Sequence, residues 1–84
     1  MNRAWKYVLH QQAFEYIDGL RPTERRKVRD AMLNLVALPW QQPAGEIRPL
    51  NDRAYQIKEL PGFRIIYWLD VFVKEVCIVR VDRM

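Results

Sequence analysis

Long basic side chains recur in the last third of this sequence, at Lys58, Arg64 and Arg80. Clustered Lys and Arg bind the phosphates of a nucleic acid backbone, and they also stabilise the extra negative charge of a phosphorane-like transition state. Tyr67 and Trp68 occur in the same segment and offer aromatic surfaces on which a base can stack. If the fold brings these residues to one surface, the sequence predicts an RNA-binding or phosphoryl-transfer site there.

The elements that must position these cations are three strands expected within residues 54–84. β-branched and aromatic residues alternate there with polar ones, and Pro61 and Gly62 mark a turn between the first two strands. Arg64 and Trp68 are expected to share the non-core face of the middle strand. The alternate residues of that strand are apolar and are expected to face the core: Phe63, Ile65, Tyr67 and Leu69.

The register of the first hairpin decides where Lys58 points. If Ile57 lies on the core face, Lys58 lies beside Arg64 on the other face, and the loop must have an odd number of residues with Gly62 at positive φ. A two-residue loop would instead place Glu59 opposite Arg64 and point Lys58 into the core. The hydrophobic pattern favours the odd-length loop.

The last strand has a purely apolar set of alternate residues in Cys77, Val79 and Val81, which leaves Arg80 on the face with the other cations. Cys77 is expected to be a small buried hydrophobic residue. The alternative for the cations is that they only keep an exposed sheet face soluble, or that they form ion pairs with Asp70, Glu75 and Asp82.

The N-terminal half is expected to form one strand and two helices. Residues 4–9 alternate as a strand with Trp5, Tyr7 and Leu9 on one side. Residues 11–18 form a short helix with Phe14 and Ile17 inward, which ends at Gly19.

A second helix is expected from about Pro22 to Leu38. Leu33 and Val36 fall on the same side of this helix as Arg29, as an apolar patch with a basic margin. This patch is either ordinary surface or part of a groove for a binding partner. The residues at helical spacing that should face the core are Val28, Ala31, Met32, Leu35 and Leu38.

The expected fold is α+β: an N-terminal strand, two helices, then three or four mostly antiparallel strands, as a single domain over residues 1–84. Glu46 to Leu50 is a candidate short strand before a turn at Asn51 and Asp52. Two helices cover only one face of such a sheet. The other face is therefore expected to stay at least partly open and to carry the cations.

Composition narrows the function classes. The formal net charge of +4 and a pI near 9.6 favour an anionic partner, either nucleic acid or an acidic protein. With one cysteine and one histidine, neither a disulfide framework nor a zinc site nor a Ser-His-Asp set is expected, and a reducing cytoplasm fits. No apolar run approaches the roughly 20 residues of a membrane span. No metal or cofactor is expected.

A Tyr-x-Ile-Lys strand at residues 55–58 precedes an aromatic-Arg-hydrophobic-hydrophobic-Tyr strand at residues 63–67. Together with residues 35–39, 47–50 and 76–83, these strands resemble the RelE/ParE superfamily, the toxins of bacterial type II toxin–antitoxin modules. The likeness spans nearly the whole chain, and the two strands are its most specific part. It implies a RelE-like fold and an acidic antitoxin as partner.

Members of the RelE branch cut mRNA on the ribosome without a metal, through clustered Lys and Arg. By position, the resemblance implies that Lys58 contacts or activates the RNA and that Arg64 stabilises charge on the scissile phosphate. Arg83 matches a basic residue at the end of the last strand, Arg48 falls near a further basic contact, and Gln56 stands where a second catalytic lysine can occur. The predicted catalytic residues are thus Lys58, Arg64 and Arg83, and the predicted RNA-binding residues are Arg48, Gln56, Trp68 and Arg80.

The sequence departs from this family at its last strand, where Met84 takes the place of a second arginine and the usual C-terminal Tyr or His has no counterpart. Two alternatives therefore stay open beside the ribosome-dependent endoribonuclease. One is a ParE-like inhibitor of DNA gyrase, and the other is an attenuated toxin that only binds its antitoxin. In each case the antitoxin is expected to cover the basic sheet face or the patch of Arg29, Leu33 and Val36.

Overall fold

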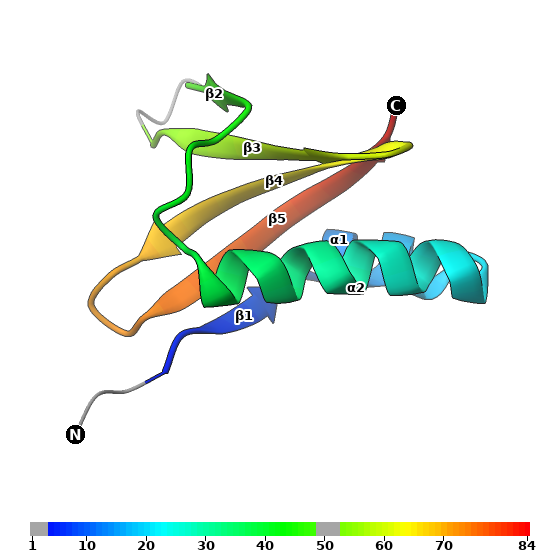
Figure 1. Cartoon of the computed structure of the whole chain (residues 1–84), viewed down its shortest axis with the longest axis horizontal. Helices are drawn as coiled ribbons and strands as arrows, with labels where there is room; N and C mark the ends of the chain where they lie inside the picture. The colour runs from blue at the N-terminus through cyan, green and yellow to red at the C-terminus, as the bar shows by residue number, and fades with distance from the viewer. Residues whose placement is uncertain (1–3, 49–52) are drawn as a thin grey trace.

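A computed structural model describes residues 4–48 and 53–84, in which two helices pack against one face of a five-stranded sheet (Figure 1). This arrangement confirms the α+β fold expected from the sequence. In chain order the elements are β1 (Lys6–Leu9), α1 (Gln11–Asp18), α2 (Pro22–Ala37), β2 (Gly45–Ile47), β3 (Tyr55–Leu60), β4 (Phe63–Asp70) and β5 (Glu75–Arg83).

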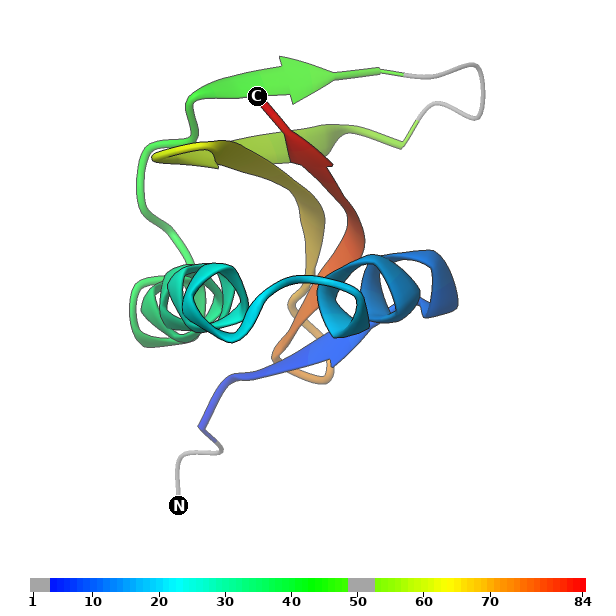
Figure 2. The same cartoon turned by 90° about the vertical axis from the view of Figure 1, so that its right-hand side faces the viewer.

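The strands lie in the order β1-β5-β4-β3-β2. β1 runs parallel to β5, and the other neighbours are antiparallel. Figure 2 looks along α2 and shows the sheet curving from β1 to β2 around the two helices. The predicted short strand at 46–50 is found as β2, whereas the predicted turn at Asn51 and Asp52 lies outside the described residues. We call the side that the helices cover the helix side and the opposite side the open side.

The core fills the space between the helices and the sheet. It confirms most of the predicted core positions, and Trp5, Tyr7 and Leu9, which were expected on one side of the first strand, all pack against it. Phe14 was expected to point inward but is 55% exposed, because the eight-residue α1 buries Ala13 and Ile17 instead. The most buried residues on the helix side are Ala13, Ile17, Val28, Met32, Leu35, Phe63, Ile65, Tyr67, Val76, Ile78 and Val81.

The prediction that Leu38 faces the core is also wrong. α2 ends at Ala37, and the backbone of Leu38 leaves the helical region at φ −133° and ψ 68°. Its side chain is therefore 58% exposed rather than in line with Leu35. None of the described helices is long and apolar enough to cross a membrane.

The hairpin between β3 and β4 corrects the predicted register. Leu60 pairs with Phe63, so the loop has two residues and not an odd number, although Gly62 does take a positive φ of 88°. Glu59 therefore faces Arg64, and Lys58 faces Ile65 on the helix side. The prediction that Lys58 and Arg64 share one face is wrong, and so is the core position predicted for Ile57, which pairs with Ile66.

A β-bulge in β5 explains why Cys77 lies on the other side of the sheet from the one predicted. Ile78 pairs with Tyr67 and Arg80 pairs with Ile66, which leaves Val79 without a partner in β4. The extra residue shifts the side-chain alternation along β5. Cys77, buried as expected, consequently lies opposite Trp68 on the open side, while Val81 lies in the core. The bulge also brings Arg80 to the open side.

Candidate functional site

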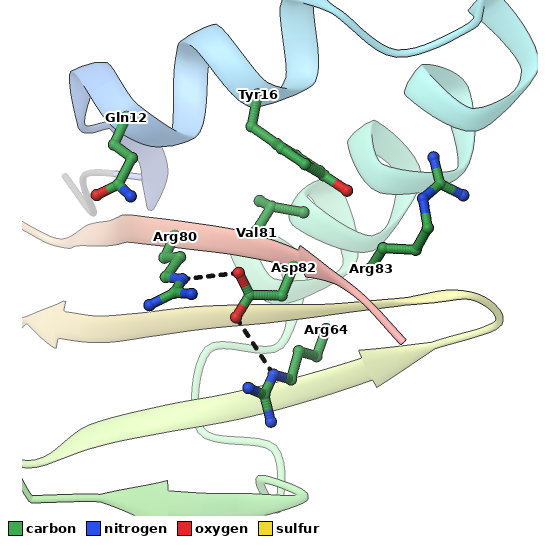
Figure 3. A pocket seen from close by; sticks show the side chains of 7 residues that line it. All are labelled: Gln12, Tyr16, Arg64, Arg80, Val81, Asp82 and Arg83. Atoms are coloured by element: carbon green, nitrogen blue, oxygen red, sulfur yellow. Dashed lines mark hydrogen bonds and ion pairs between the residues drawn. The ribbon is translucent and has the colours of Figure 1, made fainter.

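Three arginines surround one pocket at the C-terminal end of β5. Arg64 comes from β4, and Arg80, Asp82 and Arg83 come from β5, while Gln12 and Tyr16 of α1 form the opposite wall (Figure 3). We call this pocket, of about 480 Å³, the arginine pocket. β1 pairs with β5 only as far as Ile78, so beyond Ile78 the edge of β5 that does not pair with β4 lies next to α1 instead of a further strand.

Asp82 holds two of these arginines together. Its carboxylate accepts a hydrogen bond from Arg80 Nε at 2.7 Å and another from Arg64 Nε at 3.4 Å (Figure 3). Both contacts use Nε, and no ion pair among the described residues occupies the terminal nitrogens of either guanidinium. Arg64 and Arg80 are about half exposed, whereas Asp82 is mostly covered. The pair therefore keeps an excess positive charge with donors that can reach a phosphate.

Arg83 belongs to the same pocket but is tied to α2. Its guanidinium forms a bidentate pair with Glu24, with Nη1 to Oε2 at 2.8 Å and Nη2 to Oε1 at 3.3 Å. This pair holds the pKa of Glu24 below its usual value and raises the pKa of Arg83. The guanidinium also lies 4.9 Å from the centre of the Phe63 ring. Arg83 is thus fixed at the rim, and much of its charge is compensated.

Lys58 lies apart from the arginine pocket. Its ammonium group donates to Asn34 Oδ1 at 2.9 Å and to Gln41 Oε1 at 2.8 Å, on the helix side near the end of α2. The expected gathering of three cations is therefore wrong for Lys58, whereas Arg64 and Arg80 do lie together. The alternative of ion pairs with Asp70, Glu75 and Asp82 is confirmed only for Arg64 and Arg80, which both pair with Asp82. A catalytic role for Lys58 stays a prediction.

The other residues predicted to bind RNA lie in two further places. Arg48 pairs with Glu46 at 2.8 Å beside the edge strand β2. Gln56 and Trp68 both line a second pocket of about 370 Å³, together with Trp40 and Arg53. We call this second pocket the tryptophan pocket. The structure therefore separates the predicted RNA-binding residues into different sites.

The patch predicted to bind the antitoxin is smaller than expected. Leu33 is exposed, but Val36 packs against the core. Arg29 lines a shallow apolar groove with Phe14 of α1, and Leu33 and Val36 do not line that groove. The three residues therefore do not line one common groove.

Several residues of these pockets were not found from the sequence, among them Gln12, Tyr16, Trp40 and Arg53. Gln12 and Tyr16 are one helical turn apart, so they share a face of α1, and this spacing is the signal that would have grouped them. Trp40 was assigned only to a loop. Within residues 4–48 and 53–84, no group of three His, Cys, Asp or Glu side chains is arranged to hold a metal ion.

Comparison with known proteins identifies the fold. No family model and no curated protein matches the sequence. Among solved structures, the toxin–antitoxin complex RelBE2 from Mycobacterium tuberculosis aligns with a TM-score of 0.81 and 18% identity, over 98% of this chain and 100% of that one. The isolated E. coli RelE toxin aligns with a TM-score of 0.76 and 18% identity, over 95% of this chain and 84% of that one.

The archaeal RelE–RelB complex from Pyrococcus horikoshii OT3 aligns with a TM-score of 0.75 and 15% identity, over 96% of each chain. The fold implied by the two motif strands is therefore confirmed. This chain has the fold of the RelE toxins.

Proposed function

We propose that this chain is the toxin of a type II toxin–antitoxin module and that it cleaves mRNA on the ribosome, with the RNA phosphate bound in the arginine pocket. The observation that carries this proposal is the pair of half-exposed guanidiniums of Arg64 and Arg80, held side by side through Asp82. The structures that share the fold are described as RelE toxins and as complexes of RelE with RelB. These descriptions support the same function for this chain.

The chemistry needs little beyond positioned positive charge. The 2′-hydroxyl of the RNA attacks the neighbouring phosphorus, the bond to the 5′-oxygen breaks, and the proton lost by the 2′-hydroxyl is balanced by the one gained by the leaving oxygen. The phosphorane-like transition state carries an additional negative charge on its equatorial oxygens. Arg64 and Arg80 stabilise this charge, and removal of one such group typically lowers the rate by about 10²–10³-fold.

An acidic antitoxin is the expected protein partner. The chain carries a formal net charge of +4, and no helix within the described residues covers the open side. An acidic segment laid over the arginine pocket would occupy the donors of Arg64 and Arg80 and thereby block access of the RNA. Neutralisation of the toxin then follows from competition for the same guanidiniums.

Induced expression in a bacterial host tests the proposal. Wild-type protein should arrest growth, stop translation and produce mRNA ends that map to the ribosomal A site. Arg64→Ala should relieve the arrest without changing the far-UV circular dichroism or the Tm, because Arg64 is a half-exposed residue. Arg26→Ala is the matched control, since it removes the same charge from an exposed position of α2 outside the pocket.

Other outcomes would overturn the proposal. Undiminished arrest by the Arg64→Ala variant would remove the arginine pocket from the mechanism. DNA breakage and filamentation with intact mRNA would favour a gyrase inhibitor. A well-folded wild-type protein without toxicity would favour a module that only binds its antitoxin.

A further inference from the structure

The tryptophan pocket is not used by the proposed cleavage step. It lies at the end of β4 away from Arg64, where Trp68 and Leu69 face the start of β3 and the loop that carries Trp40. Its volume of about 370 Å³ lies within the range of about 300–1,000 Å³ that is usual for small-molecule sites. The pocket is therefore large enough for one planar heterocycle.

Trp40 offers an aromatic platform at the mouth of this pocket. Its side chain is 70% exposed, which is unusual for so large an apolar residue. It is nonetheless held in place, because Trp5 meets it in an edge-to-face contact with ring centres 6.0 Å apart and an interplanar angle of 85°. A fixed and exposed indole is the kind of surface on which single-stranded nucleic acids stack their bases.

Arg53 and Trp68 form a second planar element of the pocket. The guanidinium carbon of Arg53 lies 3.8 Å from the centre of the Trp68 ring, at stacking distance. Guanidinium planes stack on bases as aromatic rings do, and their positive charge attracts the neighbouring phosphate. Among the described residues that line the pocket, none is Asp or Glu.

Gln56 supplies the polar group that could distinguish bases. Its carboxamide combines a donor and an acceptor, which matches the paired donor and acceptor on the edge of a base. It pairs in register with Tyr67 of β4 and so belongs to the helix side, and it lines the pocket together with Trp68 of the open side. The pocket thus combines stacking surfaces with one side chain able to read a base edge.

The distance to the arginine pocket is compatible with one RNA strand. Arg64 and Trp68 lie four residues apart along β4 on the open side, which corresponds to about 13 Å. A few nucleotides of unpaired RNA span this length. A phosphate held by Arg64 and a base in the tryptophan pocket can therefore belong to the same strand.

We propose that the tryptophan pocket binds one unpaired RNA base, stacked on Trp40 and selected by hydrogen bonds from Gln56. RNA as the ligand rests on the proposed function, but base binding itself requires neither the ribosome nor cleavage. The pocket would give the protein a sequence preference a few nucleotides away from the scissile phosphate.

Fluorescence anisotropy with a labelled single-stranded RNA of about ten nucleotides tests this on the isolated protein. A set of RNAs, each lacking the base at one position, locates the base that enters the pocket. At one position, base removal should weaken binding to the wild-type protein about tenfold, which is within the range for loss of one base–aromatic stack. The same base removal should leave the affinity of Trp40→Ala unchanged, because that variant has already lost the platform.

Two further variants make the test specific. Gln56→Ala should change the ranking of the four bases at that position while keeping the affinity for the RNA that lacks the base. Phe14→Ala is the matched control, because it removes an exposed aromatic side chain from α1 that does not line the pocket, and it should behave like the wild type. Circular dichroism and Tm confirm that each variant is folded.

The proposal is overturned if every RNA lacking one base binds as tightly as the intact RNA, or if Trp40→Ala keeps the full penalty for base removal. Its failure is distinguishable from failure of the proposed function. If Arg64→Ala relieves growth arrest but removal of no single base weakens RNA binding, the proposed nuclease function stands and the base site is rejected. If removal of one base weakens RNA binding but the wild-type protein is not toxic, the base site stands and the nuclease function is rejected.

Discussion

The two sides of the sheet hold their basic residues in different ways. On the helix side, Lys58 donates to the neutral side chains of Asn34 and Gln41, near the end of α2. On the open side, Arg64 and Arg80 share the carboxylate of Asp82 at the margin of a pocket. The lysine therefore joins two elements of the fold, whereas the arginines are kept close together and accessible.

We infer that the hydrogen bonds of the helix side contribute to stability and that the arginines of the open side serve the proposed RNA binding. Hydrogen bonds between a strand and a helix end stabilise the folded state, because unfolding breaks them. Exposed ion pairs contribute little to stability, commonly about 0–1 kcal/mol, so Asp82 is more useful for orienting the guanidiniums. Substitutions on the two sides should separate these contributions.

The largest expected difference is between two adjacent isoleucines of β4. Ile65 is completely buried in the main core on the helix side, while Ile66 is buried on the open side outside that core. Ile65→Ala should lower the free energy of unfolding by about 3–4 kcal/mol, and Ile66→Ala by about 1–2 kcal/mol, because fewer packed neighbours surround the cavity that it leaves. Urea denaturation measures both. Equal decreases in the free energy of unfolding would show that the packing around Ile66 on the open side stabilises the protein as much as the main core does.

Lys58→Met should have the next largest effect. The variant keeps the aliphatic chain and removes the ammonium group, so the free energy of unfolding should fall by about 1 kcal/mol. RNA binding in the arginine pocket should be unchanged. A double-mutant cycle with Asn34→Ala should show that the two losses are not additive. An unchanged stability together with lost RNA binding would return Lys58 to the catalytic role implied by the family resemblance.

The position of Lys58 could not be predicted from the sequence, although most of the fold could. The three C-terminal strands, both helices and the core face of β4 follow from local periodicity, and the structure confirms them. The register of the first hairpin does not, because hydrophobic alternation alone treats an inward lysine as impossible. Asn34 and Gln41 make that position favourable, and both are far from Lys58 in the sequence.

The bulge at Val79 also could not be predicted from the sequence, and it changes which side of the sheet the β5 residues near the site occupy. Strict alternation correctly placed Arg80 with Arg64 and Val81 in the core, but it gave the wrong face for Cys77. An extra residue in one strand is set by the packing of both sheet faces and has no signal in the local sequence pattern. The composition of the arginine pocket could therefore be predicted only in part, and its wall from α1 could not.

The variant Glu24→Gln tests whether Arg83 stabilises the fold through its ion pair or is available for binding, as Arg64 and Arg80 are. Since Arg83 lowers the pKa of Glu24 in the folded state, their attraction is fully present above the ordinary glutamate pKa and is lost as the pH falls through the folded value. The Tm of the wild type should therefore decline more steeply below about pH 4.5 than the Tm of Glu24→Gln. Thermal unfolding at pH values from 3 to 7 measures this.

Glu15→Gln is the control for that measurement, since it removes a carboxylate from α1 without touching Arg83. Parallel Tm curves for the wild type and Glu24→Gln would mean that the bidentate pair contributes nothing to folding. Arg83 would then be as free to bind RNA as Arg64 and Arg80.

Tyr67→Phe should have the smallest effect at neutral pH. Tyr67 is completely buried on the helix side, and its hydroxyl finds no hydrogen-bond partner among the described residues. Removing a buried hydroxyl that has no partner is expected to change the free energy of unfolding by less than about 0.5 kcal/mol, or to raise it slightly. Tyr55→Phe, at a half-exposed position of β3, is the matched control.

The same variant should become distinctly more stable than the wild type at high pH. Burial raises the pKa of Tyr67 in the folded protein, so the folded state keeps its proton when the unfolded chain begins to lose it near pH 10. The wild type therefore loses stability as the pH rises above about 10, and Tyr67→Phe avoids this loss. Urea denaturation at pH 7 and pH 10.5 measures both effects. A loss of more than about 1 kcal/mol at pH 7 would instead show that the hydroxyl is hydrogen-bonded, for example to a buried water, and that the helix side contains a polar group essential to its packing.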